Sequence, residues 1–291
     1  MMGISIAGLD PSGGAGIIAD MKTFQALDIH GTSVITALTS QNPNKVFSLM
    51  PVDTEYIKEQ FDSIFDGYGE YINYGKTGML YSPEIIKTVA KKIKEYDINI
   101  VVDPVMIASA GGPLLKDEKE IKKSKEIIAN ALKKYLLPKS IITTPNIAEA
   151  EILAGMKIDN PDDAKKAAYK IGKISNVIIT GGHLNGINTI FNKSNNELKT
   201  IKKVLIETKN THGSGCTFSA ALTSYLIKEN NLNITDLNIT DLDITNLNIT
   251  NLNTNNLSIS IEKSLDFTEI AIKNGEYGTL KQARCFNHEK F

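Results

Sequence analysis

The chain has 291 residues, 42% of them hydrophobic and 22% charged, which is typical of a globular protein with one large α/β domain. Its formal net charge of −1 gives no indication of a nucleic acid or an anionic membrane as a partner. No apolar run reaches the roughly 18 residues of a membrane span, and the two cysteines, Cys216 and Cys285, lack metal-ligand spacing, so we expect a cytoplasmic protein.

Short apolar strands alternate with amphipathic helices along most of the chain. We expect strands at 4–7, 33–38, 71–76, 98–102, 140–143, 177–180 and 204–208. Helices are expected at 19–27, 54–65, 83–96, 118–135, 147–154, 161–173 and 261–275. The segment 188–206 is predicted to contain a hairpin with a polar turn near Asn195. This alternation predicts an α/β fold with a mostly parallel central sheet and helices on both faces.

Glycine and polar clusters follow the expected strands. They lie at residues 8–16, 41–42, 75–79, 103–106, 144–149 and 181–183. In open parallel sheets, ligands bind beyond the carboxyl ends of the strands. We therefore expect these clusters to form one composite active site.

The segment Thr211-His212-Gly213-Ser214-Gly215-Cys216 precedes a run of small residues that we expect to be a helix. The first amides of a helix have no intrahelical acceptor and favour an anion, typically a phosphate. Cys216 would lie beside that anion, where its side chain could act on a hydroxyl group. The segment indicates a kinase site, and the alternative is an ordinary glycine turn before a packed helix.

A second glycine cluster, residues 8–16, follows the first expected strand. It is not a Walker A loop, because no Lys-Ser/Thr pair follows the glycines, and it lacks the GxGxxG spacing of dinucleotide sites. It could let a small flat substrate approach bare backbone, with Asp10 and Asp20 as polar contacts. The alternative for Asp10 is a turn-forming side chain that caps its own loop.

Residues 231–261 carry a five-residue repeat with leucine at 232, 237, 242, 247, 252 and 257. A five-residue period fits neither a helix nor a plain strand, and six repeats are too few to bury a core by stacking. We expect a low-complexity surface insertion within a single domain that spans residues 1–291. The alternative is a short β-coil, similar to a pentapeptide repeat, docked on that domain.

Seven motifs occur in a characteristic order, and their sequences are IAGLDPSGGAGIIADMKTF, SVITALTSQN, GKTGML, DPVM, TPNIAEAE, GGH and NTHGSGCTFSAAL. Together they resemble the hydroxymethylpyrimidine/phosphomethylpyrimidine kinases of thiamine biosynthesis, in the ribokinase-like superfamily. The resemblance covers residues 3–225 and 261–275 and implies a three-layer sandwich. It implies ATP-dependent phosphorylation of 4-amino-5-hydroxymethyl-2-methylpyrimidine and then of its monophosphate.

Three other functions are weighed, and the presence of both the Asn146/Glu149 pair and the 213–216 loop argues against one of them, a non-catalytic ligand-binding protein on the same scaffold. A pyridoxal kinase of the same superfamily acts on a small aromatic ring that also carries a hydroxymethyl arm. A thiol enzyme would pair Cys216 with His212, although no third orienting group is evident.

The resemblance implies an acceptor pocket. Gln41 matches the glutamine that hydrogen-bonds the aminopyrimidine, since a side-chain amide can donate and accept at once. Gly8 and Asp20 match substrate-pocket positions of the first loop, and Met79 and Val105 match apolar wall positions.

The resemblance also implies an ATP and Mg²⁺ site. Asn146 and Glu149 form the N-x-x-E pair that organises Mg²⁺ around phosphates, a coordination that this ion prefers. Asp103 would support the same ion or cap a turn, and Gly182 of the GGH motif would contact the nucleotide.

Gly213, Ser214, Gly215 and Cys216 match the anion hole of the family. A thiolate at a helix N-terminus can have a lowered pKa, so Cys216 could accept the substrate's hydroxyl proton, or it could only shape the site. The sequence leaves the oligomeric state open, and the resemblance is compatible with a homodimer.

Overall fold

The computed structural model describes residues 1–106, 118–235 and 254–283. Within these residues, nine strands form one sheet in the order β3-β2-β1-β4-β5-β6-β7-β8-β9. The six strands from β2 to β7 in that order are parallel, whereas β3, β8 and β9 join antiparallel at the two edges. The bounds are β1 (Met2–Leu9), β2 (His30–Asn42), β3 (Lys45–Pro51), β4 (Ile72–Thr77), β5 (Asn99–Val102), β6 (Ser140–Thr143), β7 (Asn176–Ile179), β8 (Ile187–Asn192) and β9 (Glu197–Lys202).

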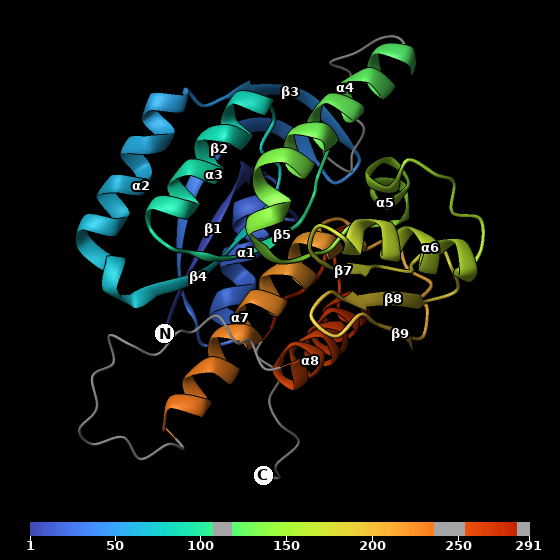
Figure 1. Cartoon of the computed structure of the whole chain (residues 1–291). Helices are drawn as coiled ribbons and strands as arrows, with labels where there is room; N and C mark the ends of the chain where they lie inside the picture. The colour runs from blue at the N-terminus through green and yellow to red at the C-terminus, as the bar shows by residue number, and fades with distance from the viewer. Residues whose placement is uncertain (107–117, 236–253, 284–291) are drawn as a thin grey trace.

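Helices cover both faces of the sheet (Figure 1). The bounds are α1 (Gly16–Ala26), α2 (Thr54–Tyr68), α3 (Pro83–Glu95), α4 (Glu118–Ala131), α5 (Ile147–Ala154), α6 (Pro161–Gly172), α7 (Ser214–Thr235) and α8 (Thr254–Lys273). Side chains of α1, α7 and α8 form one hydrophobic cluster with Val101 of β5, and side chains of α2 to α6 form another with Ile100 and Val102. Because successive strand residues point to opposite faces, β5 contributes to both clusters. The expected three-layer sandwich is confirmed.

The order of the strands places a switch point at one end of the sheet. β1 lies between β2 and β4 and is parallel to both, so the chain changes direction across the sheet after β3. In such sheets the carboxyl ends at this switch point leave an opening in which ligands bind. Here Leu9 ends β1 and Thr77 ends β4, so the loops that follow them lie at the switch point.

Most expected elements are present with bounds that shift by a few residues, and β6 and α5 match residue for residue. The strand expected at 204–208 is wrong, because these residues are irregular and Val204 is 74% exposed. They follow the edge strand β9, where the sheet offers no further partner within the described residues. β3 is not anticipated, because it pairs only with β2 and leaves most of its side chains exposed.

The helix expected to begin at Ile261 begins at Thr254 instead. Leu257, the last leucine of the repeat, is buried in the cluster of α7 and α8, so the end of the repeat belongs to the hydrophobic core. At the other end, α7 continues to Thr235. Residues 236–253 of the expected insertion and the tail with Cys285 lie outside the described residues.

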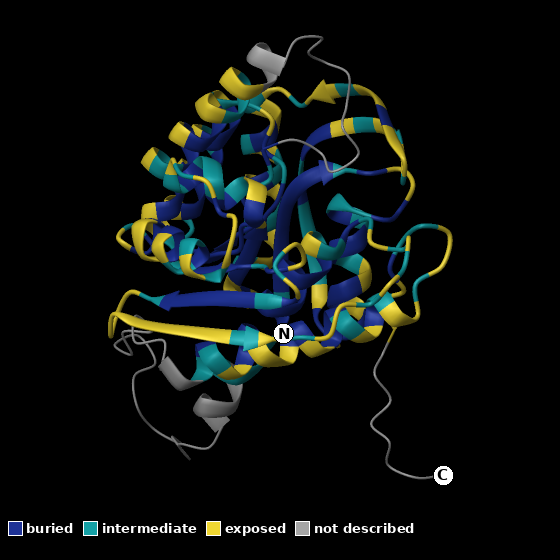
Figure 2. Cartoon of the chain, turned by 90° about the vertical axis from the view of Figure 1, so that its right-hand side faces the viewer, coloured by how far each residue is buried: buried dark blue, intermediate teal, exposed yellow. Residues whose placement is uncertain are grey.

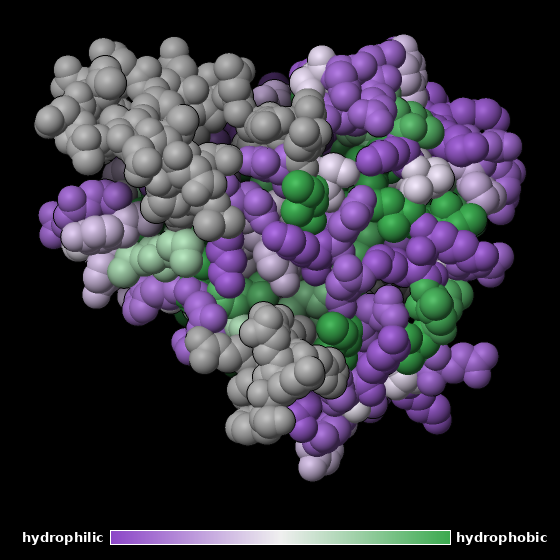
Figure 3. Space-filling model, turned by 90° about the horizontal axis from the view of Figure 1, so that it is seen from below, coloured by the Kyte–Doolittle hydropathy of each residue, from purple (hydrophilic) through white to green (hydrophobic). Residues whose placement is uncertain are grey.

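The outer surface is mostly polar. β8 is largely buried while the edge strand β9 is exposed and carries lysines, as Figure 2 shows. The face seen from below in Figure 3 has hydrophobic side chains in small groups among hydrophilic ones. None of the helices in the described part of the chain is long and apolar enough to cross a membrane.

Candidate active site

The two glycine loops are in direct contact. Gly213 has a positive φ of 87°, and a side chain there would place its Cβ 1.8 Å from the carbonyl oxygen of Gly14. Only glycine fits this position. The imidazole Nε2 of His212 also lies 2.8 Å from Asp10 Oδ2. The loop before α1 and the loop before α7 therefore meet, as the sequence predicts for one composite site.

Asp10 holds the first loop in shape. Its Oδ1 accepts from the amide of Ser12 at 2.8 Å and its Oδ2 from the amide of Ala15 at 2.9 Å. Burial would raise the pKa of Asp10, but hydrogen bonds from His212 and Ser12 outweigh burial and hold the pKa below its usual value. Asp10 thus has the turn-forming role that was the alternative in the sequence.

The start of α7 has the helix N-terminus that the sequence predicts as an anion site. The amide of Ser214 donates to Thr211 O at 3.1 Å, and the amide of Thr217 donates to Gly213 O at 2.8 Å. The amides of Gly215 and Cys216 lie between them at the positive end of a 22-residue helix, where an anion is favoured.

Cys216 differs from expectation in its protonation. Burial raises the pKa of its thiol to about 12, and Lys76 only partly offsets this effect. The expected lowering of the pKa at the helix N-terminus is therefore wrong for the free protein. The amide of Gly16 hydrogen-bonds Cys216, whereas His212 bonds to Asp10, so this arrangement does not support a Cys–His nucleophile.

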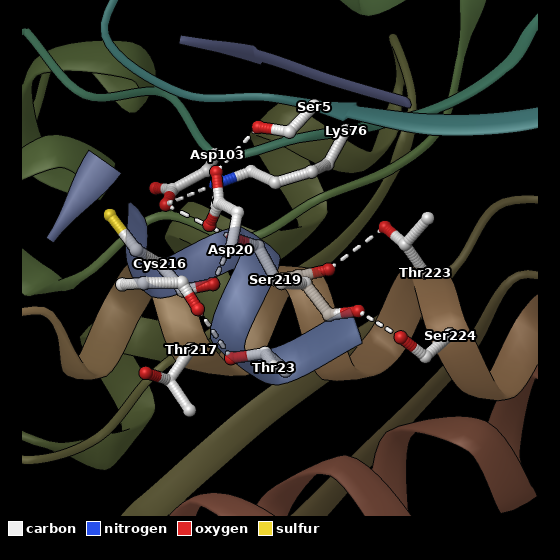
Figure 4. A network of polar contacts seen from close by, with 12 residues as sticks. Ser5, Asp20, Thr23, Lys76, Asp103, Cys216, Thr217, Ser219, Thr223 and Ser224 are labelled. Carbon is white, nitrogen blue, oxygen red and sulfur yellow. Dashed lines mark hydrogen bonds and ion pairs between the residues drawn. The ribbon is translucent and has the colours of Figure 1, made fainter. Parts of the chain in front are cut away.

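A buried ion network lies behind the two loops (Figure 4). The ammonium Nζ of Lys76 is 3.0 Å from Asp20 Oδ1 and 3.9 Å from Asp103 Oδ2. Ser5 Oγ donates to Asp20 Oδ2 at 2.6 Å. The side chains of Asp20 and Lys76 are fully buried, so Asp20 faces the network rather than an open pocket.

Lys76 is the member of this network that sequence reasoning does not assign to the site. Burial alone would lower the pKa of Lys76, but the negative charges of Asp20 and Asp103 raise it, and the side chain stays an ammonium. Its signal in the sequence is a single lysine, between Gly75 and Gly78, in a strand that has no other charged residue.

Asp103 and Glu149 form a pair of like charges. Asp103 follows β5, and its Oδ2 accepts from Ser219 Oγ at 3.2 Å. Burial, together with the charge of Asp20, raises the pKa of Asp103 to about 6, although Lys76 opposes the change. Burial and the charge of Asp103 raise the pKa of Glu149 to about 8. A bound cation would relieve the repulsion between the two carboxylates.

Asn146 and Glu149 also form the capping box of α5. Asn146 Oδ1 accepts from the amide of Glu149, and Glu149 Oε2 accepts from the amide of Asn146, both at 3.0 Å. Among the described residues, no group of three or more His, Cys, Asp or Glu side chains could hold a metal ion. Two carboxylates completed by phosphate oxygens nevertheless fit Mg²⁺, which is commonly bound through one or two carboxylates and substrate phosphates.

Four expected acceptor residues, Gly8, Gln41, Met79 and Val105, lie near the carboxyl ends of β1, β2, β4 and β5. A side chain on Gly8 would place its Cβ 2.5 Å from the terminal methyl carbon of Met79, so this methyl lies over bare backbone. Gln41 lies at a bulge in β2, and its Oε1 is buried without a hydrogen-bond partner. Val105 is half-buried just beyond Asp103. An unpaired buried acceptor is costly, so Gln41 indicates a ligand that donates.

Gly182 lies at the next strand end along the sheet. It follows β7, is exposed, and has nothing within 4 Å of the position that a Cβ would occupy. A bridge between Asn146 and Thr180 joins this strand end to the start of α5. The open backbone of Gly182 is thus on the same side as Asn146 and Glu149.

Comparisons with known proteins agree with this geometry. A family model described as phosphomethylpyrimidine kinase matches residues 10–235. A hydroxymethylpyrimidine/phosphomethylpyrimidine kinase of Bacillus subtilis is 43% identical over 235 residues, which cover 79% of this chain and 83% of the relative. A pyridoxine kinase of the same organism is 38% identical over 77% of this chain and 82% of its own length. The ADP complex of Bacillus subtilis pyridoxal kinase superposes with a TM-score of 0.75 at 33% identity, over 94% of this chain and 92% of that chain.

Proposed function

The chain belongs to the phosphomethylpyrimidine kinase family and has the ribokinase-like fold, and from this we propose its reaction. It transfers the γ-phosphoryl group of ATP to the hydroxymethyl group of 4-amino-5-hydroxymethyl-2-methylpyrimidine, and then to the monophosphate that results. This is the activity that thiamine biosynthesis requires. The observation that carries the choice of acceptor is the unpartnered, buried Oε1 of Gln41 near the carboxyl end of β2.

The acceptor ring occupies the space bordered by Gly8, Met79 and Val105. Its exocyclic amino group donates to Gln41 Oε1, and the Gln41 amide NH₂ donates to a ring nitrogen. A flat ring suits this space, because Gly8 has no side chain and the Met79 thioether adapts to an apolar face.

Transfer takes place where the two loops meet. The acceptor's hydroxymethyl oxygen attacks the γ-phosphorus, the bond from that phosphorus to the bridging oxygen of ADP breaks, and ADP leaves. The amides of Gly215 and Cys216 stabilise the charge on the transferring group. Because the Cys216 thiol is protonated, it shapes the anion site and can donate a hydrogen bond to the transferring phosphoryl group. The proton of the acceptor's hydroxyl group passes to a phosphoryl oxygen. Phosphoryl transfer asks little of a base, since positioning and charge stabilisation dominate.

ATP and Mg²⁺ belong on the side of Asn146. We propose that Asp103 and Glu149 hold Mg²⁺, with Asn146 fixing the orientation of Glu149. The ion would neutralise charge on the β- and γ-phosphates. The exposed backbone of Gly182 leaves room for the nucleotide.

The test is product formation. The purified protein, ATP, Mg²⁺ and the hydroxymethylpyrimidine should yield a monophosphate and a diphosphate, identified by mass. Gln41→Ala should raise KM for the pyrimidine about tenfold or more, since removing one partner of a buried hydrogen bond costs about 1–3 kcal/mol. Gln25→Ala, at an exposed position of α1, is the matched control and should leave KM unchanged. Failure of the wild-type protein to phosphorylate the ring would refute the proposal.

Pyridoxal is a second candidate acceptor. The similarity to a pyridoxine kinase and to the pyridoxal kinase structure supports it. We expect a lower kcat/KM for pyridoxal, because a pyridine ring lacks the amino group that would donate to Gln41. Competition between the two rings for one pool of ATP measures the preference.

We further propose a cytoplasmic location and a homodimer. Cys216 is a free thiol, which fits a reducing compartment. The edge strand β3 exposes Phe47 and Met50, at 55% and 59%, along unpaired backbone that a second copy could cover. Light scattering should give a dimer that Phe47→Glu dissociates and that Tyr56→Glu, at an equally exposed aromatic residue on α2, leaves intact.

A further inference from the structure

The ammonium of Lys76 lies directly behind the reaction centre. Its Nζ contacts Asp20 and Asp103, and Asp103 Oδ2 is the atom nearest to where a side chain on Gly215 would project, at 3.8 Å. The side chain of Lys76 is fully buried, and that of Asp103 is 5% exposed. The positive charge is therefore fixed near the start of α7, on the same side as Cys216 and Ser219 (Figure 4), where water screens it little.

The network contains more negative groups than positive ones. Asp20 and Asp103 provide two carboxylates, and Lys76 provides the ammonium between them. We call Asp20, Lys76 and Asp103 the floor of the site. Without Lys76, this floor would present two carboxylates, and no positive charge, to the substrates that bind above it. With Lys76, the net charge of the floor is less negative by one unit.

The two acceptors differ mainly in charge. The hydroxymethylpyrimidine is a neutral alcohol, whereas its monophosphate carries about −1.5 to −2 charges at pH 7. In the second transfer, a phosphate oxygen of the monophosphate attacks the γ-phosphorus, a P–O–P bond forms, the bond to ADP breaks and ADP leaves. Two anionic groups must then approach each other above the floor that contains Lys76.

We propose that Lys76 is the specificity-determining residue that lets this site use the phosphorylated pyrimidine as well as the alcohol. The inference rests on the proposed function. Lys76 acts through its charge and through its hold on Asp103, since its full burial keeps it from the substrate. Asp20 orients Lys76 by their contact at 3.0 Å, and Ser5 orients Asp20 in turn.

The experiment measures kcat/KM for the alcohol and for the monophosphate, with ATP and Mg²⁺, in the wild type and in variants. The ratio of the two values is the readout, because both acceptors carry the same ring and general damage to the site cancels. Lys76→Met should lower the ratio of monophosphate to alcohol about tenfold or more, as expected for a unit charge acting over several ångströms in a protein interior. The double variant Asp20→Asn with Lys76→Met restores the charge balance and should return the ratio to within about threefold of the wild type.

Lys92→Met is the matched control. Lys92 is also a buried lysine, with ion pairs to Asp62 at 2.6 Å and Glu95 at 2.9 Å, but it lies on α3. It should lower stability and leave the ratio unchanged. If Lys76→Met does not fold, Asp20→Asn alone decides, because it makes the floor more positive and should raise the ratio.

An unchanged ratio in folded Lys76→Met, or in Asp20→Asn if that variant must decide, would overturn the inference while leaving the kinase assignment intact. A double variant whose ratio stays as low as that of Lys76→Met would also overturn it, since charge balance would then not be the cause. A wild-type protein that phosphorylates neither acceptor would instead remove the proposed function.

Discussion

At the scale of single residues, Cys216 is half-buried in the first turn of α7, and its raised pKa keeps the thiol protonated. Its pKa of about 12 means that it stays neutral through pH 9. Alkylation requires the thiolate. We therefore expect iodoacetamide to modify Cys216 in the native protein far more slowly at pH 8 than it modifies a free thiol, with the rate rising only at higher pH. Peptide mapping by mass separates Cys216 from Cys285, and fast modification of Cys216 at pH 7 would contradict the neutral thiol.

The carboxylates of Asp103 and Glu149 give a second pH dependence. Their pKa values are raised in the folded protein, from 3.8 to about 6 for Asp103 and from 4.5 to about 8 for Glu149, so stability falls as pH rises from each ordinary value to the raised one. Metal ligands must be deprotonated, so affinity for Mg²⁺ with ADP should rise between pH 6 and 8. Calorimetry should show this rise in the wild type and a flatter profile in Glu149→Gln. Equal pH slopes in the two proteins would argue against Glu149 as a ligand.

Several of these residues could be predicted from the sequence and others could not. Gly8, Asp103 and Gly213 follow strand ends or precede a helix, and local pattern is enough to identify them. Lys76 could not be assigned, because only the packing of β4 against α1 shows that it meets Asp20. The raised pKa of Cys216 could not be predicted either, since burial depends on neighbours distant in the chain.

At the scale of elements, α5 has two tasks, because its capping box also fixes Glu149. α6 provides a matched comparison, since Asn160 Oδ1 caps it by accepting from the amides of Asp162 and Asp163 at 3.0 Å. Asn146→Ala and Asn160→Ala should each lower the free energy of unfolding by about 1 kcal/mol. Only Asn146→Ala should also raise KM for ATP, which unfolding curves and steady-state kinetics on both variants would reveal. An equal effect on KM would mean that Asn146 is only a cap.

The elements themselves follow the hydrophobic pattern of the chain, except where tertiary context decides. β3 is a strand because it pairs antiparallel with β2. Residues 204–208 follow the edge strand β9 and pair with no strand among the described residues. The start of α8 lies inside the repeat because Leu257 packs between helices and strands of the core, a contact that a five-residue period does not reveal.

At the scale of the whole molecule, the strand order explains the location of the site. The change of direction beside β1 places the switch point at the carboxyl ends of β1 and β4, which pair with each other, and the loops before α1 and α7 meet close to the end of β1. The loops that we propose for the acceptor and for the transferring phosphoryl group come from segments about 200 residues apart in the chain, and the contact between Gly14 and Gly213 shows that they meet.

The most direct test is a crystal structure with the hydroxymethylpyrimidine and a non-hydrolysable ATP analogue bound together. We predict that the ring lies against Gly8 and Met79, with its amino group on Gln41 Oε1. The hydroxymethyl oxygen should lie within about 3–3.5 Å of the γ-phosphorus, above the amides of Gly215 and Cys216. A ring bound away from Gln41, or a γ-phosphate distant from the start of α7, would contradict the account.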